Sequence, residues 1–172
     1  CVKEIDKIRR KISDECFTAA RKPGNVFRLT VPTGGGKTFS SLRFALERAV
    51  LSGDVKRIFY VIPFNTILDQ NALDIRTALG DTIDILEHHS NVIFDADDSD
   101  ESEEYTRLTE RWDSDLILTS MVRFMDSLYG KSNTDARRMS ALTGAVIIFD
   151  EVQALPINCR VLFECAVDFL SN

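Results

Sequence analysis

The feature that most constrains the fold is LTVPTGGGKTFSSLRFAL, residues 29–46, which sets three glycines, a lysine and a threonine between two apolar runs. Residues 26–31 predict a strand, and leucine and alanine residues between positions 42 and 49 recur at helical spacing. Glycines lack the Cβ atoms that would keep backbone N–H groups from converging on an anion, and the start of the following helix favours negative charge. The stretch therefore predicts a phosphate-binding loop between a strand and a helix.

The residue types in this loop predict a site for ATP and Mg²⁺. Lys37 is expected to meet the β and γ phosphates, and the Thr38 hydroxyl to complete the shell of a bound Mg²⁺ ion. The general pattern G-x-x-x-x-G-K-[ST] is met only in part, because Val31 stands where its first glycine would be. The alternative is a glycine-rich turn with an incidental lysine. The expected nucleotide contacts are Thr33, Gly34, Gly35, Gly36, Lys37 and Thr38.

A second half of the same site is predicted by VIIFDEVQ, residues 146–153, in which four apolar residues precede two acids. Asp150, at the carboxyl end of a central strand, is expected to reach the Mg²⁺ ion held beside Thr38. Glu151 is expected to polarise the attacking water as a general base. The catalytic set is thus Lys37, Asp150 and Glu151. The alternative is a strand that ends in an ordinary helix-capping acid.

Strand and helix signals alternate along the chain and indicate an α/β fold. Four further strands are predicted at residues 57–62, 82–87, 115–120 and 145–150. Helical spacing is present in a first helix that a Pro-Gly pair ends at residues 23–24, and again from residue 67 to residue 79. Apolar strands separated by helices favour a parallel sheet covered on both faces, with ligands at the carboxyl ends of the strands.

Composition narrows the class of protein further. A chain of 172 residues with 44% apolar and 28% charged residues is long enough for one globular domain with a substantial core. No apolar run approaches the roughly 20 residues of a membrane span, and the first residues lack a signal peptide's apolar core, so we expect a cytoplasmic protein without a membrane partner. A net charge of −6 argues weakly against a broad basic surface for nucleic acid. Four cysteines without C-x-x-C spacing predict buried thiols rather than a zinc site.

The motifs together resemble one known family, the CRISPR-associated helicase-nuclease of type I systems, and most closely its type I-C branch. The resemblance is to the first RecA-like domain of that family and runs from about residue 8 to the end of the chain. The segments PFNTILDQNA and EHHS narrow the resemblance from superfamily 2 helicases in general to this family. The segments that carry it are LTVPTGGGKTFSSLRFAL, RIFYVIPFNTILDQNA, LEHHS, ERWDSDLILTSMVRFMDSLY and VIIFDEVQALP.

The resemblance implies a RecA-like P-loop three-layer sandwich with a mostly parallel central sheet. Residues 1–24 would form an N-terminal helix leading into the motor, and residues 25–172 the first RecA-like domain. The start without methionine and the end within a helix-like run suggest a piece of a larger protein. The implied partners are single-stranded DNA, a second RecA-like domain, a nuclease domain and the CRISPR RNA-guided surveillance complex.

The resemblance also implies contacts to the tracked DNA strand at two strand ends. Hydroxyl and amide groups at a helix start are good phosphate ligands, which agrees with this assignment, although plain helix capping is the alternative. Gln153 stands where the family often has histidine and would couple the nucleotide and DNA sites. The implied DNA contacts are Pro63, Phe64, Asn65, Thr66, Thr119, Ser120 and Arg123.

Two remaining features are expected to lie outside the nucleotide chemistry. His88 and His89 are not followed by aspartate, so they are interpreted as structural or DNA-proximal residues rather than nuclease ligands. Seven carboxylates between residues 95 and 104 predict a solvated, mobile loop.

The overall prediction is one half of an ATP-dependent helicase motor acting in antiviral defence. Because one wall of the site would be missing, the isolated chain is expected to hydrolyse ATP hardly at all. Two alternatives stay open: the core of a DEAD-box RNA helicase, which the sequence Asp150-Glu151-Val152-Gln153 disfavours, and a nucleotide-gated binding module that unwinds nothing.

Overall fold

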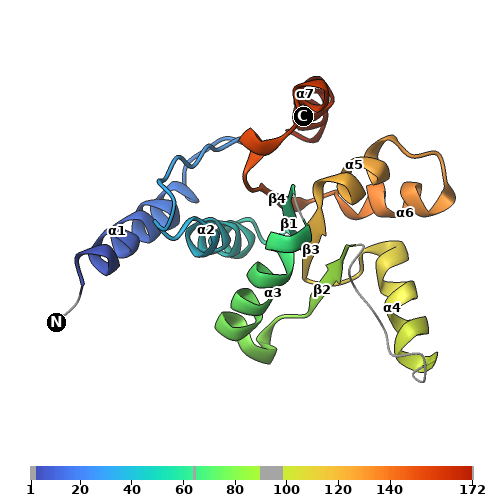
Figure 1. Cartoon of the computed structure of the whole chain (residues 1–172), viewed down its shortest axis with the longest axis horizontal. Helices are drawn as coiled ribbons and strands as arrows, with labels where there is room; N and C mark the ends of the chain where they lie inside the picture. The colour runs from blue at the N-terminus through green and yellow to red at the C-terminus, as the bar shows by residue number, and fades with distance from the viewer. Residues whose placement is uncertain (1–2, 64, 90–98, 172) are drawn as a thin grey trace.

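The computed structural model describes residues 3–63, 65–89 and 99–171, and within them it contains a four-stranded sheet whose pairings are all parallel. The strand order is β2-β3-β1-β4 (Figure 1). All four carboxyl ends therefore meet at one edge of the sheet, where ligands gather in folds of this kind. The strands are β1 (Arg57–Ile62), β2 (Ile85–His88), β3 (Leu116–Ser120) and β4 (Ala145–Phe149).

Helices cover both faces of the sheet, which confirms the predicted α/β three-layer architecture. On one face lie α2 (Lys37–Ser52) and α3 (Asn65–Leu79), and on the other α4 (Ser99–Arg111), α5 (Met121–Tyr129) and α6 (Asn133–Ala141). Outside these layers, α1 (Glu4–Ala19) packs on α2, while α7 (Ile157–Ser171) follows β4 and packs Phe163 and Leu170 against the same core as α5 and α6 (Figure 1).

Burial explains why the inner strands read as continuous apolar runs. In β1, Ile58, Tyr60 and Ile62 face the α2–α3 layer, while Phe59 and Val61 face the opposite core. All five are buried, as expected of a strand covered on both faces. The strand β4 is at the edge of the sheet and all its residues are only half-buried.

The predicted strand at residues 26–31 is absent, and this prediction was wrong. The segment has no regular secondary structure and lies outside the sheet. Side chains of α2 hold it elsewhere: Arg48 donates to the carbonyls of Ala20, Lys22 and Gly24 at 2.7–3.0 Å, and the Phe27 ring lies 4.9 Å from that of Phe44. These contacts keep the segment against α2 instead of beside β4.

Other predicted boundaries shift by a few residues. The strand predicted from residue 82 begins at Ile85, because Gly80–Thr82 form a short 3₁₀ turn. The acidic run was predicted as a loop, but residues 99–104 begin α4. Residues 95–98 lie outside the described part of the chain.

The cysteines differ in their surroundings more than predicted. Cys16 is buried, but Cys159 is half-buried and Cys165 is exposed, so the expectation of buried thiols holds for one of the three described cysteines. Across the described residues, no helix combines the length and the hydrophobicity needed to cross a membrane.

Candidate nucleotide-binding site

The glycine-rich loop closes directly onto the start of α2. Gly36 is the residue before the helix and has φ 82°, a left-handed conformation that residues with a Cβ rarely adopt. A Cβ on Gly35 would collide with the side chain of Val31. Gly35 thus makes room for Val31, the one position that departs from the general phosphate-loop pattern. The loop is a turn at a helix N-terminus, as the sequence predicted, although no strand precedes it.

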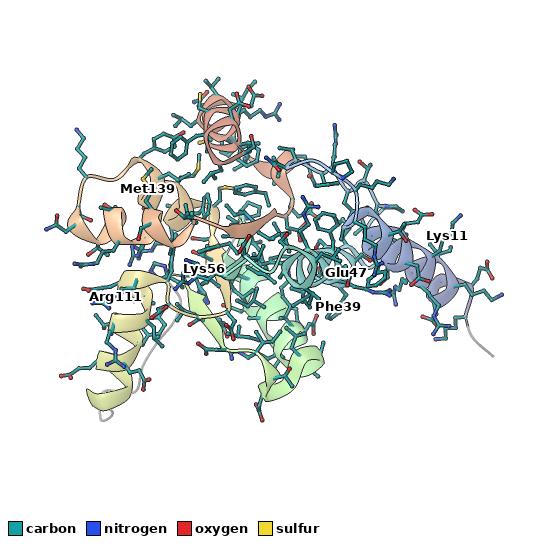
Figure 2. The ribbon with its side chains drawn as sticks, turned by 180° about the vertical axis from the view of Figure 1, so that it is seen from behind. Lys11, Phe39, Glu47, Lys56, Arg111 and Met139 are labelled. Atoms are coloured by element: carbon teal, nitrogen blue, oxygen red, sulfur yellow. The ribbon has the colours of Figure 1, made fainter. Side chains whose placement is uncertain are left out.

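The first helix, α1, borders this loop. Arg9 on α1 donates from Nε to the Gly34 carbonyl at 3.0 Å, and so ties α1 to the loop. A cavity of about 440 Å³ beside Gly36 is lined by Arg9, Arg10, Arg43 and Asp14, together with the half-exposed Phe39, which Figure 2 labels. Arg43 pairs with Asp14 at 2.8 Å, so three guanidinium groups and one carboxylate border the helix start.

The loop lysine and the second acid of the DE pair are in direct contact. The ammonium group of Lys37 forms an ion pair with Oε1 of Glu151, and Gln153 donates from its amide to Oε2 of the same carboxylate. Glu151 has φ 47° and ψ 39°, which is uncommon for a residue with a side chain. The structure thus brings Lys37, Glu151 and Gln153 together.

The first acid, Asp150, follows β4 and is held by two hydrogen bonds. Its Oδ1 accepts from the backbone N–H of Glu151 at 2.9 Å, and its Oδ2 accepts from the Tyr60 hydroxyl at 2.8 Å. The Asp150 N–H in turn donates to the Val61 carbonyl at 2.9 Å, which extends the β1–β4 pairing by one residue. Asp150 is therefore fixed at the carboxyl edge of the sheet.

The other predicted nucleotide contacts have different exposures. Thr33 and Gly34 are exposed and open to a ligand, whereas Thr38 is half-buried in the first turn of α2. The Thr38 carbonyl accepts from Ser41 Oγ at 3.0 Å. Their roles toward a nucleotide stay predictions.

Comparison with known proteins decides the family. The profile of DEAD/DEAH box helicases matches residues 10–158, a span that includes both the glycine-rich loop and the acid pair. The chain belongs to the DEAD/DEAH box helicase family. It is also 32% identical over 186 aligned residues to the CRISPR-associated nuclease/helicase Cas3 of Haloferax volcanii. That alignment covers 88% of this chain, which spans about a fifth (20%) of the length of that relative.

DEAD/DEAH box helicases bind ATP, and the contacts above lie within this helicase ATPase domain.

The predicted nucleic-acid contacts lie at the carboxyl ends of β1 and β3. After β1, Pro63 is half-buried, Phe64 lies outside the described residues, and Asn65 and Thr66 begin α3. The side chains of Asn65 and Thr66 are also outside the described part of the helicase domain. Their assignment to DNA stays a prediction.

After β3, the structure distinguishes three predicted contacts. Thr119 is fully buried and donates from Oγ1 to the His88 carbonyl at 2.9 Å, so its hydroxyl is engaged within the protein. Ser120 caps α5, because its Oγ accepts from the backbone N–H of Arg123 at 3.4 Å. The Arg123 side chain is exposed. The capping alternative therefore describes Ser120 in this structure, and Arg123 is the most accessible of the three.

The histidine pair is part of the helicase core. The indole N–H of Trp112 donates to His88 Nδ1 at 2.9 Å, and both side chains are buried. Burial, with contributions from Arg138, Arg123 and His89, lowers the pKa of His88 to about 3. His89 is also buried, with Nε2 3.4 Å from Asp69 Oδ1 and 3.5 Å from Glu87 Oε2. The structural interpretation of His88 is confirmed.

Two residues of the site were not found by sequence reasoning. Arg9 lies on α1, far from the loop in sequence, and nothing in its spacing indicates the contact with Gly34. Tyr60 carries a signal that was overlooked: it is the one hydroxyl within the apolar strand RIFYVI. A buried tyrosine hydroxyl usually finds a hydrogen-bond partner, so its partner could have been sought at a neighbouring strand end.

Proposed function

We propose that this chain is the ATP-binding wall of an ATP-dependent helicase that translocates on single-stranded DNA in CRISPR interference. The observation that carries the proposal is the Lys37–Glu151 ion pair, which joins the phosphate loop to the acid pair across most of the chain. The CRISPR context is supported by the similarity to the nuclease/helicase of Haloferax volcanii. DNA as the substrate, the CRISPR setting and the wider assembly are part of the proposal.

In this proposal Lys37 and Thr38 bind the phosphates, and Asp150 and Thr38 hold the accompanying Mg²⁺. The donor set fits: Mg²⁺ at nucleotide sites takes one or two protein oxygens and completes its shell with phosphates and water. When bound, the ion would neutralise charge on the β and γ phosphates. Both donors are hard oxygen atoms, and Asp150 is held by a hydrogen bond from the Tyr60 hydroxyl.

The ion pair also defines what must change when nucleotide binds. Lys37 and Glu151 neutralise each other while the phosphate position is free of a competing anion. A phosphate has more charge than one carboxylate and attracts the same ammonium group. Glu151 would then be released from Lys37, and with Gln153 as its remaining partner it could accept a proton from the attacking water.

The proposed partners are a second RecA-like domain, a nuclease domain and the RNA-guided surveillance complex. A second domain would supply arginines to the γ phosphate, a contribution worth roughly 10³ to 10⁵ in rate in related nucleotide hydrolases. We therefore expect the isolated 172 residues to bind nucleotide weakly and to hydrolyse it hardly at all. Robust turnover by the isolated chain, lost in Lys37→Ala, would contradict this expectation.

The decisive experiment measures ATP hydrolysis by the full-length protein alone, with single-stranded DNA and with single-stranded RNA. Glu151→Gln is the blank, because it keeps the shape of the side chain and removes the general base. Stimulation by DNA and not by RNA supports the proposal. Stimulation by RNA alone would favour the RNA helicase alternative, and absence of turnover under all three conditions would favour a nucleotide-gated binding module.

A further inference from the structure

Tyr60 has an unusual place for a polar group. It lies in the middle of β1, has no exposed surface, and packs with Leu42 and Ala45 of α2 in the apolar core. Its hydroxyl nevertheless reaches the end of the neighbouring strand, where it donates to Asp150 Oδ2 at 2.8 Å. A ring anchored in the core thus carries one donor to the edge where the nucleotide site lies.

The hydroxyl of Tyr60 touches both halves of the site. Besides Asp150, the Thr38 and Ser41 side chains in the first turns of α2 lie near this hydroxyl. One buried hydroxyl therefore connects the inner strand β1 to the acid that follows β4.

The choice of partner separates Tyr60 from the other two tyrosines. Tyr105 donates to the Glu87 carbonyl and Tyr129 to the Leu162 carbonyl, both at 2.8 Å. Main-chain carbonyls satisfy a hydroxyl without affecting any reactive side chain. Tyr60 instead occupies one oxygen of Asp150, and the Glu151 N–H occupies the other, so both ends of that carboxylate are fixed.

We propose that Tyr60 is a positioning residue that holds the Asp150 carboxylate against the Thr38 end of α2, ready for the Mg²⁺ that accompanies the nucleotide. The proposal rests on the ATP site proposed above and adds a residue to it. Hydrogen bonds from neighbouring groups orient metal ligands, and their loss typically weakens metal affinity by roughly 10- to 100-fold. The ring of Tyr60 supplies packing, and its hydroxyl supplies the orientation.

The test is Tyr60→Phe in the full-length protein, which removes the hydroxyl and keeps the ring. A fluorescently labelled ATP is titrated at increasing Mg²⁺ and, separately, with EDTA. We expect the Mg²⁺ concentration for half-maximal binding to rise about tenfold, while binding in EDTA is unchanged. A purely structural role would not produce this split. Tyr129→Phe is the matched control, since it removes one hydroxyl that donates to a carbonyl in another part of the molecule.

Each outcome decides between the two proposals. If wild-type protein does not bind the labelled ATP at any Mg²⁺ concentration, the ATP site itself fails. If wild type binds and Tyr60→Phe has the same Mg²⁺ dependence, or is weakened equally with and without Mg²⁺, the positioning role is overturned. Asp150→Asn provides a second arm: if Tyr60 acts through Asp150, adding Tyr60→Phe to Asp150→Asn should change the Mg²⁺ dependence no further.

Discussion

Two polar clusters at the carboxyl edge of the sheet differ in burial and in what their contacts can do. Lys37, Glu151 and Gln153 are half-buried or exposed, and they are joined by an ion pair and an amide hydrogen bond. His88, Trp112 and Thr119 are buried and form hydrogen bonds inside the core. The first cluster can exchange its partners for a ligand, whereas the side chains of the second are buried and bonded to one another. Exposure therefore separates the site from the scaffold more clearly than residue type does.

The largest expected effect breaks the buried cluster. Trp112→Ala removes a fully buried indole whose ring centre lies 5.1 Å from that of Phe59. The free energy of unfolding should fall by about 3–5 kcal/mol, measured by chemical denaturation. Phe169→Ala, an aromatic truncation at an exposed position on α7, is the matched control and should change it by less than about 1 kcal/mol. Equal effects of the two variants would show that Trp112 does not anchor the core.

The next effect concerns the cluster of Lys37, Glu151 and Gln153. Lys37→Ala should weaken nucleotide binding by about 10- to 100-fold, because a hydrogen bond to a charged group is lost. The free energy of unfolding should change by at most about 1 kcal/mol, because the ion pair with Glu151 is partly exposed. Isothermal titration with ATP and thermal denaturation measure the two quantities. Lys56→Ala is the control: Lys56 is exposed just before β1, at the other end of the sheet (Figure 2). A large loss of stability without loss of affinity would make Lys37 a structural residue.

A pH titration examines the buried cluster without changing its shape. The pKa of His88 is lowered from 6.5 to about 3 in the folded protein. Between these values the unfolded chain binds a proton that the folded protein does not, so the free energy of unfolding falls as pH falls through this window. The slope is about 1.4 kcal/mol per pH unit for one proton, and the effect is absent above pH 7.

His88→Asn isolates this contribution, because its amide oxygen can accept from Trp112 and does not titrate. Denaturation of both proteins between pH 7 and pH 4 gives the comparison. The free energy of unfolding of the wild type should depend on pH more steeply than that of His88→Asn, by the slope that corresponds to about one bound proton. Parallel curves would mean that His88 does not keep a lowered pKa in the folded protein.

The sequence predicted the exposed site residues and the buried strands for different reasons. Lys37 and Asp150 were predicted as site residues because phosphate and metal chemistry require particular residues at particular strand and helix ends. The two inner strands, β1 and β3, were predicted correctly because each is a buried apolar run, but the predicted strand at residues 26–31 is not formed. The position of this segment depends on contacts with Arg48, Phe44 and other side chains distant in sequence. A local sequence pattern does not predict such contacts. The hydroxyl of Tyr60 within an apolar strand was a signal that a partner should be sought, but the sequence does not identify that partner, because Asp150 lies 90 residues away.

The smallest expected effect tests a residue whose two interpretations conflict. Thr119→Val keeps the shape of the side chain and removes the hydroxyl that donates to the His88 carbonyl. Because this bond is buried, the free energy of unfolding should fall by about 1 kcal/mol in chemical denaturation. Thr77→Val, which removes an exposed hydroxyl that bonds within α3, is the control and should cost less. Binding of labelled single-stranded DNA to the same full-length proteins completes the comparison. If Thr119→Val loses DNA affinity while its stability stays at the wild-type value, Thr119 contacts the strand and the β3 end must open when DNA binds. If stability falls and DNA affinity equals that of the Thr77→Val control, the buried cluster has a structural role up to the last residues of β3. The exposed Arg123 then becomes the first residue at this strand end to examine for DNA contact.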